Sequence, residues 1–190
     1  MVRVLFLVFG AVVALTGPAF ADDVAKRTEA SREAVKKLSG ALGKELASAM
    51  EAGGPIKAVE VCNIRALAIA AEISKAEGWR VARTSLKTRN AANAPDAWEK
   101  AVMERFEARK AAGEDLAKIE HAEIVAEGGK KTFRYMKAIS TAEKPCLVCH
   151  GGDIKADLAA TLDKFYPKDR ARGFKAGDIR GAFTISQPVQ

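Results

Sequence analysis

The sequence predicts an α+β fold in which helices come first and antiparallel strands follow. Apolar residues recur at intervals of three and four through most of the region before Gly78. After that point several segments alternate apolar and polar residues, and Glu127-Gly-Gly-Lys130 is a hairpin signal between two of them. Because strands and helices do not alternate regularly along the chain, a doubly wound parallel sheet is not expected.

Residues 1–21 have the pattern of a secretory signal peptide. Arg3 precedes an apolar run, Val4 to Leu15, and Ala19-Phe20-Ala21 supplies the small residues that signal peptidase reads. The alternative is a membrane anchor, but the run is short against the roughly 20 residues that a spanning helix needs. We expect cleavage after Ala21. The remaining residues, 22–190, then form one domain in the periplasm, or outside the cell where there is no outer membrane, with no stable membrane anchor.

The formal net charge of the chain is +7, and its basic residues are scattered along the sequence. A nucleic-acid-binding protein would be expected to carry a basic stripe or patch. We therefore expect no nucleic-acid partner.

Two helices are expected in the first part of the domain. Asp22 or Asp23 is positioned to cap a helix that runs to about Met50, and Gly53-Gly54 ends it. Pro55 suits the first turn of a second helix, which runs to Gly78.

The later elements follow from alternation and from loop composition. Trp79, Val81 and Arg83 alternate as in a strand, and a polar loop follows at residues 89–96. A third helix carries Trp98, Val102 and Phe106. Two strands then flank the Gly-Gly hairpin, and in the second of them Phe133, Tyr135, Lys137 and Ile139 share one face. A short helix near residues 156–164 and a last strand near residues 180–186 complete the chain.

Cys146-Leu-Val-Cys149-His150 is the C-x-x-C-H pattern of c-type haem attachment. Two thiols add to the two vinyl groups of one haem, and a single turn of chain spans that separation. The next residue then lies under the ring centre, where an imidazole nitrogen reaches the iron. We therefore expect one covalent haem c. The alternatives are a Cys146–Cys149 disulfide and a zinc site that adds Cys62 to the motif.

The residues alone leave two questions open, namely which residue is the sixth iron ligand and which residues bind the haem propionates. His121, Cys62 and the methionines, among them Met136, are all candidates for the ligand. Cys62 lies within an apolar helical stripe, and an unpaired thiol in an oxidising compartment needs protection, which iron ligation would give. Arg83 and Arg89 are candidates for the propionates, because arginine binds carboxylate bidentately; ordinary surface charge is the alternative for both.

Several stretches resemble a family of exported monohaem domains, first catalogued as a domain of unknown function, whose structural prototype is a soluble cyanobacterial c-type haem protein. The matching stretches are Ala58–Asn63, Arg83–Lys87, Arg89–Asp96, Arg134–Lys137, Pro145–Gly151, and Tyr166-Pro167 through Gly177–Gly181. The resemblance implies a PAS-like antiparallel sheet flanked by N-terminal helices. It also implies that the iron lies between His150 and a cysteine thiolate, which is Cys62 in this chain. Ala91 departs from the proline that the family more often has after Arg-Asn.

Members of that family often form the sensing region of kinases and chemoreceptors. The resemblance therefore implies a redox or small-ligand (gas) sensor that works with a redox or signalling protein partner. The alternative is a low-potential electron-transfer protein. A third class is an enzyme of the peroxidase type. Two protein ligands on the iron would leave no open position for a substrate, so we do not expect an enzyme.

Overall fold

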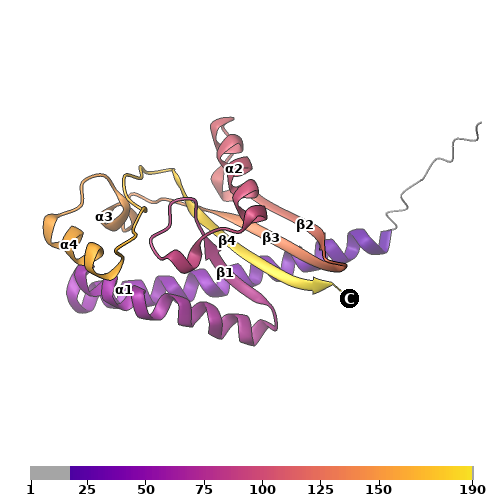
Figure 1. Ribbon diagram of the computed structural model, residues 1–190, viewed down its shortest axis with the longest axis horizontal. Helices are drawn as coiled ribbons and strands as arrows, with labels where there is room; N and C mark the ends of the chain where they lie inside the picture. The colour runs from indigo at the N-terminus through magenta and orange to yellow at the C-terminus, as the bar shows by residue number, and fades with distance from the viewer. Residues whose placement is uncertain (1–17, 190) are drawn as a thin grey trace, which may run out of the picture.

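A bent helical hairpin forms one layer of the structure, a computed structural model that describes residues 18–189 (Figure 1). Helix α1, Pro18–Glu77, is interrupted at Gly53 and Gly54. Gly54 has φ 69° and ψ −163°, a conformation that side-chain-bearing residues avoid, so the two predicted helices and the glycine break between them are confirmed. The predicted cap at Asp22 or Asp23 is wrong, because α1 begins at Pro18 and both residues lie within it.

The predicted signal peptide falls mainly on residues 1–17, which lie outside the described residues, so its cleavage stays a prediction. Within residues 18–189, no helix has the length and the apolar character needed to span a bilayer.

The second layer is a four-stranded antiparallel sheet with the order β1-β4-β3-β2. Its strands are β1, Arg80–Thr84; β2, Glu120–Glu127; β3, Lys130–Ser140; and β4, Ile179–Val189. Gly128 and Gly129 join β2 to β3 with φ values of 56° and 77°, as a tight hairpin turn requires. Helices followed by an antiparallel sheet confirm the predicted α+β class.

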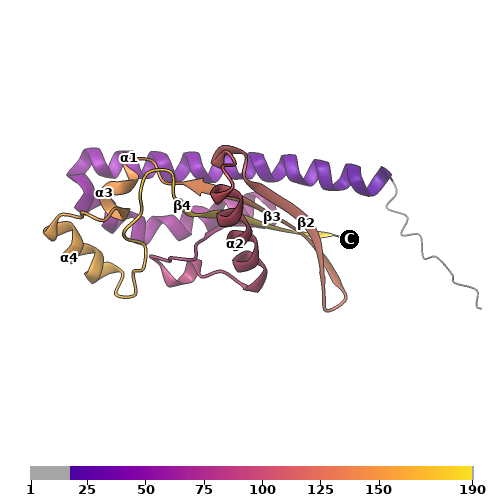
Figure 2. The same ribbon diagram turned by 90° about the horizontal axis from the view of Figure 1, so that it is seen from above.

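Three further helices and two 3₁₀ turns complete the fold. They are α2, Ala97–Ala111; α3, Cys146–His150; α4, Ala156–Phe165; and the turns Ala91–Asn93 and Leu116–Lys118. Helix α1 covers one face of the sheet and α2 the other, while α3 and α4 lie at the end where α1 bends (Figures 1 and 2).

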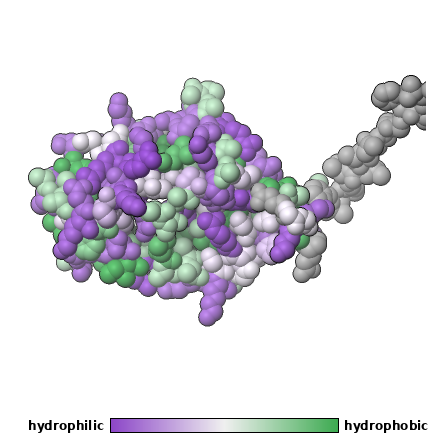
Figure 3. All heavy atoms as spheres, in the orientation of Figure 1, coloured by the Kyte–Doolittle hydropathy of each residue, from purple (hydrophilic) through white to green (hydrophobic). Residues whose placement is uncertain are grey.

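Side chains from both faces of the sheet are buried, because helices cover both faces. Phe133 and Tyr135 of β3 pack into the cluster shared with α1, whereas Met136 and Ala138 pack into the cluster shared with α2. A third cluster joins α4 to the second half of α1 through Val59, Leu158, Leu162 and Tyr166. The face shown in Figure 3 is mainly hydrophilic, and its apolar residues form separate patches.

Candidate functional site

The C-x-x-C-H motif forms the one-turn helix α3. The Val148 N–H donates to the Pro145 carbonyl at 3.2 Å, and the Gly151 N–H donates to the Leu147 carbonyl at 2.9 Å. Because residues three apart lie on the same side of a helical turn, Cys146 and Cys149 are neighbours on α3. Both thiols are free and half-buried, so the disulfide alternative is not formed here. Two adjacent thiols and a histidine after them fit the predicted attachment of one flat ring.

The imidazole of His150 is held in one tautomer. Its Nδ1 lies 2.8 Å from the Ala171 carbonyl oxygen, and because that oxygen can only accept, Nδ1 carries the proton. The Arg180 Nε lies 3.2 and 3.3 Å from Nδ1 and Nε2, so its guanidinium lies against the ring rather than in line with one nitrogen. Burial, together with the charges of Arg180 and Arg89, lowers the pKa of His150 to about 3. A neutral imidazole with its lone pair on Nε2 is the form that binds a metal.

Cys62 lies on the second half of α1, in the region that packs against the motif helix. Val59, one turn before it, belongs to the cluster against which Cys149 packs. Burial raises the pKa of Cys149, Arg89 opposes this, and the nearby Cys62 thiol adds to it. The fold therefore brings Cys62 to the motif although 84 or more positions separate them in the sequence.

Arg83 lies beside Cys62. On β1 it shares a face with Val81, which packs into the α1 cluster. Burial raises the pKa of the Cys62 thiol, and Arg83 is the charge that opposes this most. Within the described part of the chain, the Arg83 side chain forms no hydrogen bond or ion pair. A half-buried cation without a protein anion suits either a thiolate or the carboxylate of a bound group.

Arg89 contacts the motif and is bound to protein groups. Its guanidinium donates to the Cys149 and Ala171 carbonyls and pairs with Asp169. These contacts place Arg89 at the predicted site. They give it protein partners there, and its predicted contact with a propionate stays a prediction.

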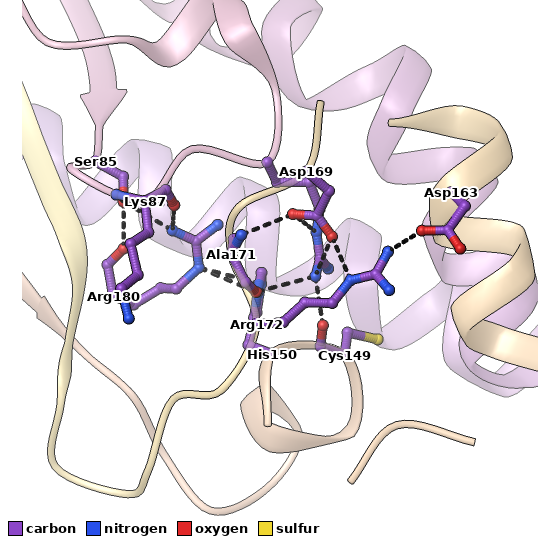
Figure 4. A network of polar contacts seen from close by, with 10 residues as sticks. Ser85, Lys87, Cys149, His150, Asp163, Asp169, Ala171, Arg172 and Arg180 are labelled. Carbon is purple, nitrogen blue, oxygen red and sulfur yellow. Dashed lines mark hydrogen bonds and ion pairs between the residues drawn. The ribbon is translucent and has the colours of Figure 1, made fainter. Parts of the chain in front are cut away.

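Arg180 is a site residue that our sequence reasoning missed. Besides His150, its guanidinium binds the Ser85 hydroxyl at 3.1 Å and the Lys87 carbonyl at 3.3 Å (Figure 4). The available signal was its position in the Gly177–Gly181 stretch, which the sequence analysis noted without assigning a role to its arginine.

Three of the other candidate ligands, His121, Met103 and Met136, lie away from the motif. His121 on β2 contacts Glu123 at 2.9 Å, and Met103 and Met136 are buried in the cluster between the sheet and α2. Within residues 18–189, no three histidine, cysteine, aspartate or glutamate side chains converge as a metal site.

Comparisons with known proteins agree on one family. The model of the family described as Tll0287-like matches residues 19–188. Among solved structures, the crystal structure of the cyanobacterial heme-protein Tll0287 aligns with a TM-score of 0.61 and 26% sequence identity. The alignment covers 92% of this chain and 98% of that one. No curated protein sequence matches this chain.

Proposed function

Since this chain belongs to the Tll0287-like family, we propose that it binds one haem covalently through Cys146 and Cys149, with His150 as an iron ligand. The observation that carries the proposal is the position of the His150 imidazole, whose Nδ1–H donates to the Ala171 carbonyl, next to two free thiols one turn apart. A similar protein is described as a heme-protein, which supports the same assignment. The haem would supply a one-electron couple and a site for diatomic gases.

Cys62 is the second ligand that we propose. Its support is the packing of the second half of α1 against the motif and the position of Arg83, whose charge favours the thiolate. An anionic sulfur ligand stabilises ferric over ferrous iron, so the reduction potential should be low.

We propose that the protein is a redox or gas sensor in the periplasm rather than an enzyme. Its signal would pass to a protein partner. Helix α1 would carry the signal, because it holds Cys62 and forms much of the main apolar cluster. When an added reductant supplies an electron, the Cys62 thiolate would take a proton from solvent and leave the iron, and α1 could then shift. A low-potential electron carrier is the second candidate, because two firmly held protein ligands would reduce reorganisation on electron transfer.

The first experiment concerns attachment. The exported protein should have its N-terminus at Asp22 and a mass of apoprotein plus one haem, and it should keep its colour in acid and organic solvent. A colourless protein, or haem that is extracted by the solvent, would contradict the proposal.

The second experiment concerns Cys62. Cys62→Ser should change the ferric absorption spectrum and raise the reduction potential while the haem stays attached, because a serine hydroxyl is a much weaker ligand. His121→Ala is the matched control and should leave both unchanged, since His121 contacts Glu123 on the far strand β2. If the Cys62→Ser spectrum equals that of the unmodified protein, Cys62 is not the ligand.

Reduction separates the sensor from the carrier. A sensor should bind carbon monoxide or nitric oxide after reduction, because Cys62 leaves the iron. A carrier should stay six-coordinate, refuse both gases and pass electrons rapidly to a small cytochrome.

A further inference from the structure

We infer that Arg89 and Asp169 act as a positioning pair that orients His150 and the end of the motif helix. This role rests on the proposed function, because it concerns the residue that would bind iron. It differs from the propionate contact predicted for Arg89, since it needs only contacts within the protein.

The pair is a buried connection between three segments of the chain. The side chains of Arg89 and Asp169 are 11% and 2% exposed. The Asp169 carboxylate accepts from the Arg89 Nε at 3.2 Å and from the Ala171 N–H at 2.8 Å. The Arg89 Nη2 donates to the Cys149 carbonyl inside the motif. Arg89, in the loop after β1, therefore joins the motif helix to residues 169–171.

The pair reaches His150 through one carbonyl group. The Ala171 oxygen accepts from the Arg89 Nη2 at 3.1 Å and from the His150 Nδ1 at 2.8 Å, so its two lone pairs serve both residues. The Asp169 carboxylate fixes the same residue from its N–H side. Ala171 is thus held at its N–H and at its carbonyl. The fixed carbonyl sets the direction of the His150 ring, and with it the direction of Nε2.

The following residues hold the same segment against the motif. The Gly173 N–H donates to the Gly151 carbonyl at 3.0 Å, and the Phe174 N–H donates to the His150 carbonyl at 2.9 Å. The Phe174 ring packs edge-on against the imidazole, with 6.2 Å between ring centres. These contacts fix the backbone near His150, whereas Arg89 and Asp169 fix the acceptor of its ring proton.

Lysine at position 89 is the discriminating change. A lysine keeps the charge and can still pair with Asp169, but its ammonium group lacks the planar fork that lets arginine reach two carbonyls and a carboxylate together. Arg172→Lys is the matched control. Arg172 also binds Asp169, at 2.9 Å, and Asp163, at 2.6 Å, but it forms no hydrogen bond to the Ala171 carbonyl or the motif (Figure 4).

Two readouts report on the His150 ring. In the full chain produced without haem, ¹⁵N NMR of labelled histidine gives the tautomer ratio, with His121 as the internal reference because the chain has two histidines. Arg89→Lys should lower the Nδ1–H to Nε2–H ratio by about fivefold, which is what one hydrogen bond of roughly 1 kcal/mol contributes. In the haem-loaded protein, the ferric EPR signal should change from one low-spin species to more than one.

Arg172→Lys should match the unmodified protein in both readouts. Circular dichroism checks that each variant is folded. If Arg89→Lys does not accumulate, Asp169→Asn provides the second variant, because it weakens the same carbonyl geometry and should shift the tautomer ratio in the same direction. An unchanged ratio and a single EPR species in the position-89 variant would overturn the inference. If the unmodified protein carries no haem, the proposed function fails, and the tautomer ratio still decides whether Arg89 orients His150.

Discussion

Replacing Glu99 by alanine should destabilise the protein by about 3–5 kcal/mol, the usual effect of removing one partner from a buried ion pair. Glu99 lies in the first turn of α2 and is 1% exposed. Its Oε1 accepts from the Thr184 hydroxyl at 2.8 Å, from Arg80 at 3.0 Å and from Arg134 at 3.3 Å. Its Oε2 accepts from the Asp96 N–H at 3.1 Å, which closes a capping box at the start of the helix.

The lower end of that range is expected, because Arg134 keeps a second partner. Its Nη2 also lies 2.6 Å from the Asp96 carboxylate. Loss of the hydrogen bond from the Asp96 N–H to the Glu99 carboxylate adds about 1 kcal/mol, which brings the total to about 4 kcal/mol. For a chain of this size, 1 kcal/mol corresponds to roughly 2–4 °C in Tm, so the Tm should fall by about 8–16 °C.

Urea unfolding followed by circular dichroism measures the change. Glu104→Ala on the same helix is the control. The Glu104 side chain is 59% exposed and lies 3.9 Å from Lys100, so its loss should change stability by less than about 1 kcal/mol. If Glu99→Ala destabilises the protein no more than the control does, the buried network is not an important source of stability.

Three further predictions concern the site and its support. Arg83→Lys should shift the haem potential more than Lys87→Arg does in a redox titration, because Arg83 is the half-buried cation beside Cys62; equal, negligible shifts would indicate ordinary surface charge. Gly151→Ala should lower Tm and haem attachment, since a Cβ there would lie 2.6 Å from the Leu147 carbonyl oxygen, whereas Gly152→Ala, with nothing within 4 Å, should change little. Burial raises the pKa of Asp96, but hydrogen bonds from Arg134 and the Glu99 backbone outweigh it and lower the pKa overall. The stability from Asp96 is therefore present above about pH 4 and lost as the pH falls through the lowered pKa, and urea midpoints of Asp96→Asn should depend less on pH in that range.

The sequence by itself determined the elements and the motif, because both depend on neighbouring residues. Glycine pairs end the first helix and form the β2–β3 hairpin, and each does so through its own backbone freedom. The thiols of Cys146 and Cys149 share one side of a turn because of their spacing alone. Local interactions of this kind act between residues a few positions apart, so they can be read along the chain.

Only the tertiary structure decided what surrounds His150. Arg180 reaches the imidazole from the start of β4, and Asp169 holds Arg89 and the Ala171 N–H from a loop. The ion pair of Asp96 and the largely buried Arg134 likewise joins two stretches whose contact cannot be read along the chain. Periodicity and spacing do not specify such pairs, because strand register and the packing of helices on the sheet determine which distant side chains meet. Cys62 was a candidate ligand from its sequence context and the family resemblance, but its proximity to the motif depends on how α1 bends and packs against α4.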